Sequence, residues 1–516
     1  MKKLPIGLQT FSKLIEGDYY YADKTPLIAK LVESGQYYFL SRPRRFGKSL
    51  LISTLKSAFA GEEKLFKDLY LEKNWDWSKQ YAVIPISFGR GVVSSVKVLN
   101  QTLSSILNEV AQSYGVCLTE DTEANRFAEL IRALRNLTGL PVVILIDEYD
   151  KPILDNIDKE ELALTIRDAL KNIYSVIKDS DAYIKFALLT GVSKFSKISL
   201  FSGLNNLEDI SLNPDYATLC GYTEPEIKQV FGEYAANTDF ELLRQWYNGY
   251  NFLGEKVYNP FDVLLYFKNR QFKNYWFETG NPSFLLKLIR KNQYNLPKIE
   301  NIVLNEAQLG SFDIGELNLE SVLFQTGYLT IKKVEEFSGN FFYYLTYPNR
   351  EVKASLNQYL LADLTHADFS QATQNQMQIY KALESSDLTA LKQTLCAIFA
   401  SIPHDWYRKN QMSLYEGYYA SIVYSCFCAL GFTVIAEDST NHGRIDLTVM
   451  MQDKVFIIEF KVLDENSKQG TALTQIKAKN YQQKYLNADK TIFLIGIEFE
   501  KNERNIVLFE WEQVES

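Results

Sequence analysis

The feature that most constrains this chain is a short apolar strand that leads through a basic loop into a helix. Residues 37–40 are apolar, the loop ends in Gly47, Lys48 and Ser49, and Leu55 belongs to an apolar stripe along the helix that follows. A P-loop needs this order of elements. Its backbone N–H groups cradle phosphates, its lysine reaches the β- and γ-phosphates, and its serine binds Mg²⁺.

The loop departs from the general P-loop pattern at one end. That pattern is Gly-x4-Gly-Lys-[Ser/Thr], and Arg42 stands where the first glycine belongs. Gly47-Lys48-Ser49 alone also fits a basic loop before an ordinary helix. A second motif is therefore needed to distinguish a P-loop from a basic loop before an ordinary helix.

A buried strand that ends in acids supplies this second half. Residues 142–146 are apolar and mostly β-branched, which predicts a strand buried on both faces of a parallel sheet. Asp147 follows at its carboxyl end, where ligands bind in open α/β sheets. Asp147 can hold the Mg²⁺ shell and Glu148 can polarise the attacking water. An acidic loop after a core strand is the alternative for this motif alone, but the two motifs together predict a nucleotide site.

A further buried strand is predicted over residues 184–191. Thr190 and Ser193 lie at its end and are candidates for a sensor of the γ-phosphate, although capping of the next turn explains them equally well. Asp23 and Lys24 either contact the nucleotide or form a structural cap and ion pair. Because strands alternate with helices, we expect a parallel α/β sheet.

Composition narrows the class of protein. The chain has 516 residues, enough for two or three domains, and a net charge of −8 with a pI near 5.3. A generally basic nucleic-acid coat is therefore excluded, and any nucleic-acid contact must be local.

The five scattered cysteines form no metal-ligand pattern and suit reduced thiols in a cytoplasm. We expect no membrane segment, because no apolar run is long enough, and no signal peptide, because Pro5, Gly7 and Gln9 follow Lys3 too soon to leave an apolar core.

A second candidate site lies in a predicted hairpin near the C-terminus. Residues 441–451 and 454–462 are predicted as strands, with Gln452 and Asp453 as a two-residue turn. This register places Asp446 opposite Glu459 and Arg444 opposite Lys461, while Glu459 and Lys461 project from the same face.

Opposed carboxylates repel one another unless a cation lies between them. Oxygen ligands suit Mg²⁺ or Mn²⁺. Lys461 could then steady a nucleophilic water or the phosphate. An exposed hairpin with ordinary Glu/Lys pairs is the alternative for this segment.

The loop at residues 42–49, with the sequence RPRRFGKS, resembles the loop of the AAA-ATPase-like family that is joined to a C-terminal PD-(D/E)XK nuclease-like domain. In that family arginine is usual at the position of Arg42. Other matching stretches are residues 4–7, 21–25, 246–250, 258–261, 279–284 and 347–352. The resemblance implies that ATP is bound by Arg44, Arg45, Phe46, Gly47, Lys48, Ser49, Leu50, Asp147 and Thr190, that Ser49 and Asp147 hold Mg²⁺, and that Glu148 is catalytic.

The same resemblance assigns the C-terminal residues. Asp446 matches the first acid of PD-(D/E)XK, although Ile445 precedes it in place of proline, and Glu459 and Lys461 match its (Asp/Glu)-x-Lys. Glu416 matches the acid of the preceding helix and Gln475 a glutamine of the following helix. The implied metal ligands are Glu416, Asp446 and Glu459, and the implied catalytic residues are Asp446, Glu459 and Lys461.

We therefore expect three parts: a P-loop AAA-like ATPase core over residues 1–220, a helical lid with a winged-helix-like module over 221–365, and a PD-(D/E)XK nuclease-like α/β domain over 377–516. Residues 366–376 are the predicted linker. The expected function is an ATP-hydrolysing regulator fused to a Mg²⁺-dependent nuclease for DNA or RNA, by analogy in prokaryotic defence or mobile-element biology. The alternative is a nucleotide-operated switch that binds nucleic acid without cleaving it. The sequence leaves open whether the chain forms a homo-oligomer.

Overall fold

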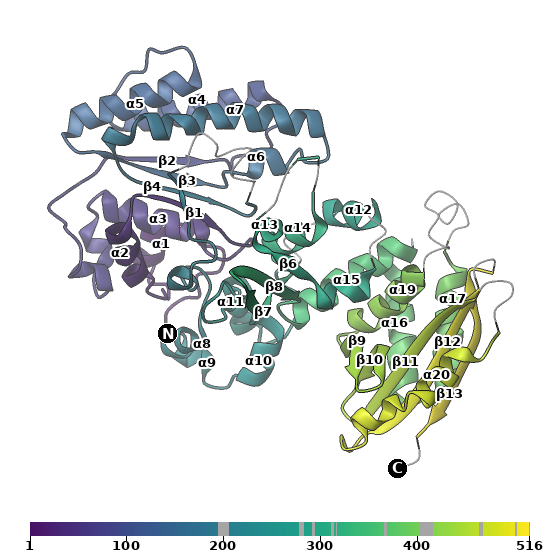
Figure 1. Ribbon diagram of the computed structural model, residues 1–516. Coiled ribbons are helices and arrows are strands. Elements are labelled where there is room, and N and C mark those ends of the chain that lie inside the picture. Colours follow the sequence, from purple (N-terminus) through teal and green to yellow (C-terminus); the bar gives the residue numbers. More distant parts are fainter. Residues whose placement is uncertain are drawn as a thin grey trace. The chain divides into compact units, whose positions relative to one another are not determined.

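The structure is a computed structural model, shown in Figure 1. It describes residues 1–194, 206–277, 283–291, 295–310, 314–315, 317–365, 369–402, 416–463, 468–500 and 503–514. The chain forms two compact units. Unit 1 contains Met1–Trp276 and Val303–Tyr344, and unit 2 contains Phe277–Ile302 and Leu345–Ser516.

Unit 1 is built on a five-stranded parallel sheet with the order β2-β3-β4-β1-β5. The strands are β1 (Tyr37–Ser41), β2 (Val83–Ser87), β3 (Val142–Asp147), β4 (Ile184–Gly191) and β5 (Glu208–Asp209). All six residues of β3 are buried, as its apolar sequence predicts. Because β4 lies between β1 and β3, the carboxyl ends of the P-loop strand and the Asp147 strand reach the same edge of the sheet, one strand apart.

Helices cover both faces of this sheet (Figure 1). On one face lie α4 (Val96–Ser113), α5 (Glu123–Thr138) and α7 (Glu160–Asp179), and on the other lie α1 (Phe11–Glu16), α2 (Thr25–Ser34) and α3 (Lys48–Phe59). Asp23 accepts hydrogen bonds from the backbone N–H groups of Thr25 and Tyr70, and Lys24 forms an ion pair with Glu226 at 2.6 Å. Both residues thus have the structural roles that the sequence left open.

Aromatic side chains from the segment after the sheet pack around the P-loop. This segment contains α8 (Glu224–Val230), α10 (Phe240–Tyr247) and α11 (Pro260–Asn269), and α8 begins with the predicted capping box of Thr223 and Glu226. Phe46 is buried with its ring centroid 4.7 Å from that of Tyr250, and the Arg45 guanidinium lies 4.9 Å from the ring of Phe261. The aromatic motifs therefore support the loop itself.

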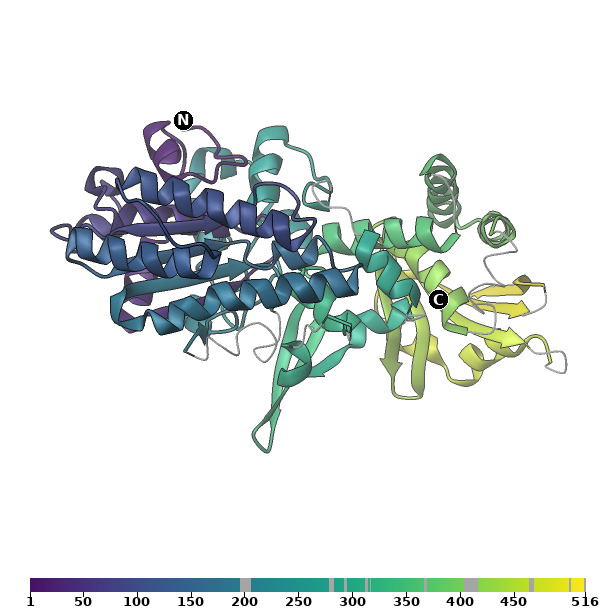
Figure 2. The ribbon, with the colours of Figure 1, turned by 90° about the horizontal axis from the view of Figure 1, so that it is seen from above.

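The rest of unit 1 is a small module, Val303–Tyr344. Its three-stranded sheet has the order β6-β8-β7, with strands β6 (Val303–Asn305), β7 (Thr330–Phe337) and β8 (Asn340–Thr346), and it carries the short helices α13 (Glu306–Leu309) and α14 (Leu319–Gln325). The hairpin of β7 and β8 extends as a narrow ribbon, teal-green in Figure 2. The winged-helix-like module that the sequence predicts falls on this part of the chain.

Unit 2 contains a mixed five-stranded sheet with the order β13-β12-β11-β10-β9. Its strands are β9 (Thr433–Thr440), β10 (Gly443–Met450), β11 (Lys454–Leu463), β12 (Thr491–Glu500) and β13 (Asn505–Gln513). Only the neighbours β11 and β12 are parallel. Helix α20 (Thr471–Ala478) packs through Ile476 on the face that carries Ile457. On the opposite face, Tyr419 of α19 (Glu416–Ala429) stacks on Phe499 at 4.7 Å.

The compact units divide the chain at other positions than the predicted domain boundaries. Helix α15 (Arg350–Thr365) packs against α19 within unit 2, and α16 (Phe369–Glu384) occupies most of the predicted linker 366–376. The polar stretch folds as a helix because Ala372 and Ile379 bury one face of it. The matched stretch 279–284 lies largely outside the described residues. No helix in the described ranges is long and apolar enough to cross a membrane.

We expect Phe46→Ala to lower the free energy of unfolding of unit 1 by about 3–5 kcal/mol, since it leaves a cavity among Tyr250 and Phe252. Urea denaturation followed by circular dichroism measures this. The matched control is Phe341→Ala, whose side chain is 41% exposed and whose loss should change stability by about 0.5 kcal/mol or less. Equal effects of the two substitutions would contradict a supporting role for Phe46.

Candidate functional site

The start of helix α3 has the features of a phosphate site. Gly47 has φ +95°, in the left-handed region that favours glycine, and no side chain of the described residues caps the helix. The first backbone N–H groups of the helix, from Lys48, Ser49 and Leu50, are therefore available to an anion. Lys48 is 7% exposed, and its Nζ donates to the carbonyl oxygens of Arg42 at 2.8 Å and Pro43 at 2.9 Å. Burial lowers the pKa of Lys48, and the charge of Asp147 opposes this shift.

Arg42 makes structural contacts with the backbone that surrounds the loop. It is fully buried, and its guanidinium donates to the carbonyl oxygens of Ser41, Ser211 and Tyr216. The same group lies 3.9 Å from the ring centroid of Phe252. Burial lowers the pKa of Arg42 to about 10. An arginine here ties the loop to the chain after β5, which a glycine could not do.

The remaining loop residues divide by exposure. Arg44 and Arg45 are exposed, and Arg45 has φ +68°. The Phe46 side chain is buried, and its carbonyl accepts a hydrogen bond from Gly221 N at 3.1 Å. The Trp276 indole donates to the carbonyl of Arg44 at 3.2 Å. The loop is thus held by its backbone, and the two arginine side chains remain accessible.

The acids after β3 form the other side of this site. Thr190 Oγ1 donates to Asp147 Oδ1 at 2.7 Å, which fixes the Asp147 carboxylate. Glu148 has φ +55°, a conformation that is uncommon outside glycine and is often found at functional sites. Its buried Oε2 has no hydrogen-bond partner within the described chain. Burial, followed by the charge of Asp147, raises the pKa of Glu148.

Asp150 was not among the sequence-derived candidates. It is 1% exposed and accepts hydrogen bonds from Val192 N at 3.0 Å and from both Ser193 N and Ser193 Oγ at 2.6 Å. Burial raises the pKa of Asp150. The hydroxyl groups of both sensor candidates are therefore engaged with the acids after β3. The sequence carries a signal for this role, because Asp150 is the third acid in the four residues that close the buried strand β3.

The C-terminal hairpin has the predicted register. Met451 N donates to Lys454 O at 2.9 Å and Leu447 pairs with Ile458. The strand pairing ends at that point, and Asp446 Oδ2 accepts a hydrogen bond from Phe460 N at 2.8 Å. The backbone of β11 therefore holds the Asp446 carboxylate next to Glu459.

Glu459 lies at the centre of this second site. Its Oε1 is 4.0 Å from Lys461 Nζ and accepts a hydrogen bond from Gln475 Nε2, while its buried Oε2 has no hydrogen-bond partner in the described residues. Burial, with the charge of Asp446, raises the pKa of Glu459 to about 8. An unpaired buried oxygen beside a second acid fits a divalent cation.

Comparison with known proteins finds a family match over each of the two parts of the chain that contain a candidate site. Residues 5–201 match a family described as a predicted AAA-ATPase, and residues 414–509 match the PD-(D/E)XK nuclease superfamily. The protein named "Uncharacterized protein in vnfD 5'region" from Azotobacter chroococcum mcd 1 is 50% identical over 509 residues, which cover 98% of each chain. The chain belongs to the AAA-ATPase-like family with a C-terminal PD-(D/E)XK nuclease domain.

In this AAA-ATPase-like chain, a residue that the sequence did not single out holds helix α20 beside the second candidate site. Glu498 of β12 accepts hydrogen bonds from the backbone N–H groups of Gly470, Thr471 and Ala472 at the start of α20. This anchors the helix that carries Gln475. Tyr481 also lies near this site. Its hydroxyl would be 2.9 Å from a Cβ placed on Gly443, and its pKa is raised first by burial and then by the charge of Glu459.

Of the two remaining candidates, Arg444 stands apart from this centre and the side chain of Glu416 is not described. Arg444 is 70% exposed in its side chain and lies 3.7 Å from Glu437, so the structure does not bring it to Lys461 as expected. The pairing of β10 with β11 ends at Leu447, so Arg444 is not held opposite Lys461. Glu416 is the first residue of α19, and its side chain lies outside the described residues. Among described residues, no group of three or more His, Cys, Asp or Glu side chains forms a metal site.

The raised pKa of Glu459 predicts a pH-dependent stability in metal-free buffer. Between pH about 4.5 and 8, Glu459 is protonated in the folded state and ionised in the unfolded state. The folded state then binds more protons, so the free energy of unfolding should fall as pH rises, by up to about 1.4 kcal/mol per pH unit. Urea denaturation of unit 2 in EDTA, compared with Glu459→Gln at each pH, measures this. Parallel pH profiles of the two proteins would refute it.

Proposed function

We propose that the chain binds and hydrolyses ATP in unit 1 and cleaves nucleic acid with the help of Mg²⁺ or Mn²⁺ in unit 2. One observation carries both parts of the proposal. Each site combines a lysine, an acid held by a hydrogen bond, and a neighbouring glutamate whose buried oxygen has no partner in the described residues: Lys48, Asp147 and Glu148 in one unit, and Lys461, Asp446 and Glu459 in the other.

In the ATPase site, the N–H groups at the start of α3 and the ammonium of Lys48 would bind the phosphates. Ser49 and Asp147 would hold Mg²⁺, which supplies neutralising charge when bound. The raised pKa of Glu148 suits a residue that orients a water and accepts its proton. Lys48 would leave the carbonyl groups of Arg42 and Pro43 to reach the phosphates.

We expect Lys48→Ala to weaken ATP binding at least a hundredfold, and Glu148→Gln to keep binding while it lowers turnover at least a hundredfold. Isothermal titration calorimetry and phosphate release measure the two quantities. Lys56→Ala, on the same helix but away from its start, is the matched control and should change neither. Wild-type ATP affinity in Lys48→Ala would disprove the phosphate assignment.

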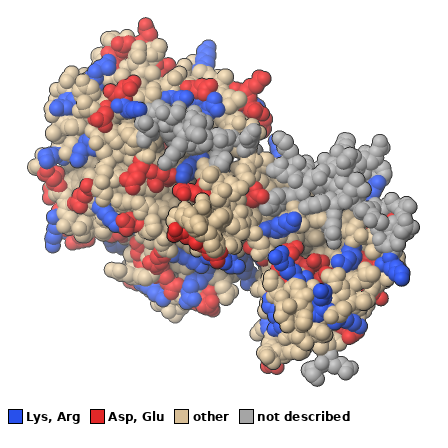
Figure 3. Space-filling view, viewed as in Figure 1, with Lys and Arg blue, Asp and Glu red and all other residues tan. Residues whose placement is uncertain are grey.

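In the nuclease site, Asp446 and Glu459 would hold the metal ion, together with Glu416, and Lys461 would steady the attacking water. The metal ion supplies charge stabilisation at the scissile phosphate when bound. Gln475, anchored through α20 by Glu498, would keep Glu459 in position. Figure 3 shows acidic and basic side chains interspersed on the face in view, so we infer that the substrate is engaged by local contacts near the site.

We expect Asp446→Ala and Glu459→Ala to abolish metal-dependent cleavage and to weaken Mn²⁺ binding, whereas Lys461→Ala should abolish cleavage and retain Mn²⁺. Labelled single- and double-stranded DNA and RNA, with Mg²⁺ or Mn²⁺ and with or without ATP, are the substrates. Arg444→Ala is the control, because its exposed guanidinium pairs with Glu437. Full cleavage by folded Asp446→Ala would overturn the assignment.

The second candidate is a nucleotide-operated switch that binds nucleic acid without cleaving it. It is favoured by the small number of carboxylates, Asp446 and Glu459, that the described residues bring together. Retained binding with no cleavage under every metal and nucleotide condition would select this function. A role in prokaryotic defence or mobile-element biology rests on analogy alone.

A further inference from the structure

The buried oxygen of Glu148 lies against the loop that follows β2. Ser87 is the last residue of β2 and pairs with Asp147 at the end of β3, so this loop begins beside the acids. A Cβ placed on Gly89 would be 3.2 Å from Glu148 Oε2 and 3.4 Å from Ser87 Oγ. The carboxylate therefore lies in space that the side chain of any other residue at position 89 would enter.

Backbone conformation does not explain the glycine at this position. Gly89 has its φ outside the left-handed region, whereas Gly91, two residues further on, has φ +96°. Gly89 N donates to Ser87 Oγ at 3.3 Å, a hydrogen bond that an alanine would also make. The close approach of Glu148 is thus the feature that requires the missing side chain.

The chain that follows the acids holds this loop in place. Lys151 Nζ donates to Gly91 O at 2.8 Å, and Asn156 Nδ2 donates to Val93 O at 2.6 Å. Asn156 is buried, so its hydrogen bond is shielded from water. Because both bonds fix the backbone shortly after Gly89, the loop cannot retreat from an added methyl group without losing them.

The turn that carries Glu148 is also enclosed on the side of β4. Tyr149 N donates to Thr190 O at 3.0 Å. A Cβ on Gly191, the last residue of β4, would lie 2.5 Å from the Tyr149 ring and 2.6 Å from Asp150 Oδ1. The turn thus packs directly on the backbone of β4 and has no space to move in that direction.

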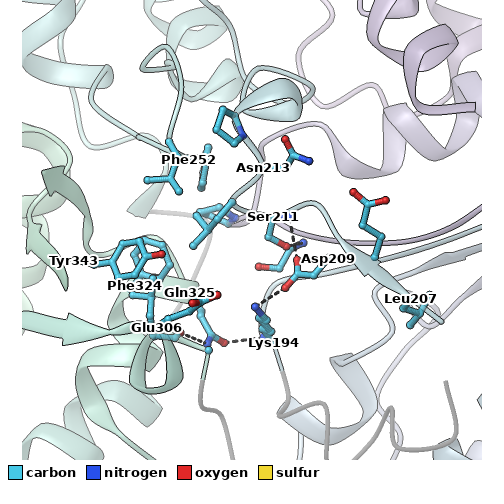
Figure 4. Close-up of a pocket in the computed structure, with 18 residues that line it drawn as sticks. Lys194, Leu207, Asp209, Ser211, Asn213, Phe252, Glu306, Phe324, Gln325 and Tyr343 are labelled. Carbon is cyan, nitrogen blue, oxygen red and sulfur yellow. Dashed lines mark hydrogen bonds and ion pairs between the residues drawn. The ribbon is translucent and has the colours of Figure 1, made fainter. Parts of the chain in front are cut away.

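The chain after β4 is anchored as well (Figure 4). Lys194 N donates to Gln325 Oε1 at 2.7 Å, and the Lys194 ammonium pairs with Asp209. With the loop fixed on one side of the turn and this segment fixed on the other, the end of the Glu148 side chain is the part that can yield to a group added at Gly89.

We propose that Gly89 is a positioning residue of the ATPase site, a role that rests on the proposed function of Glu148. Its missing side chain sets how close the Glu148 carboxylate lies to β2, and thereby where the carboxylate stands in the site. An alanine methyl would displace the carboxylate by a few tenths of an ångström. Displacements of this order in a catalytic group lower turnover. Because β3 and β4 separate β2 from β1, the methyl does not reach the phosphate-binding start of α3.

Phosphate release and isothermal titration calorimetry with ATP, both on the full chain, test this role. Gly89→Ala should lower turnover about tenfold or more and keep the ATP affinity within about twofold of the wild type. Gly232→Ala is the matched control and should change neither quantity, because the φ of Gly232 also lies outside the left-handed region and a Cβ there would meet no atom within 4 Å.

A shorter acid separates positioning from a general loss of structure. Glu148→Asp removes a methylene group and withdraws the carboxylate from Gly89. In that background Gly89→Ala should lower turnover by no more than about twofold, because the contact is already relieved. A tenfold loss in both backgrounds would show that Gly89 acts independently of Glu148 and would overturn the proposal.

Urea denaturation without nucleotide tests the contact itself. Gly89→Ala should lower the urea midpoint of the wild-type chain but not that of Glu148→Ala, which lacks the carboxylate. A Gly89→Ala chain that folds only together with Glu148→Ala would support the contact equally, and equal shifts in the two backgrounds would refute it. Normal turnover in Gly89→Ala would remove this role alone, whereas a wild-type chain without turnover would remove the proposed ATPase function and this role with it.

Discussion

The fold of unit 1 depends on the contacts of one buried charge, the guanidinium of Arg42. A charge inside a protein is stable only when hydrogen bonds or ring faces replace its water. Three carbonyl oxygens and the ring of Phe252 do so here. Those carbonyls belong to Ser41 on β1 and to Ser211 and Tyr216 beyond β5. The loop, the edge strand and the aromatic segment are therefore fixed relative to one another by a single side chain.

Each site has one buried carboxylate oxygen with no hydrogen-bond partner among the described residues, and burial of an unpaired oxygen has an energetic cost. Burial disfavours the ionised form of Glu148 and of Glu459, and a neighbouring aspartate disfavours it further. A cation or a positioned water would relieve this cost, so each site is prepared for the group that it would bind. The surrounding hydrogen bonds, from Thr190 to Asp147 and from Phe460 N to Asp446, keep the companion acids in place.

The sequence predicted the strands well because their apolar runs are long and bounded by polar residues. The register of the C-terminal hairpin also followed from its two-residue turn. The role of Arg42 could not be read from the sequence, since the carbonyl groups that bind it lie about 170 residues further along the chain. Glu498 was missed for a similar reason: its function depends on the start of α20, which lies beside β12 only in the folded sheet. Helix α16, which occupies most of the predicted linker, was missed because most residues of that stretch are polar.

The two compact units are interleaved along the chain. The polypeptide passes from one unit to the other after Trp276, after Ile302 and after Tyr344. The early segment of unit 2 includes Glu300, which accepts a hydrogen bond from Tyr424 at 2.7 Å and pairs with Lys353. During synthesis this carboxylate leaves the ribosome well before Tyr424 has been made. No single cut in the gene separates unit 1 from unit 2, so the two units cannot be inherited, expressed or lost as independent pieces without leaving part of one in the other.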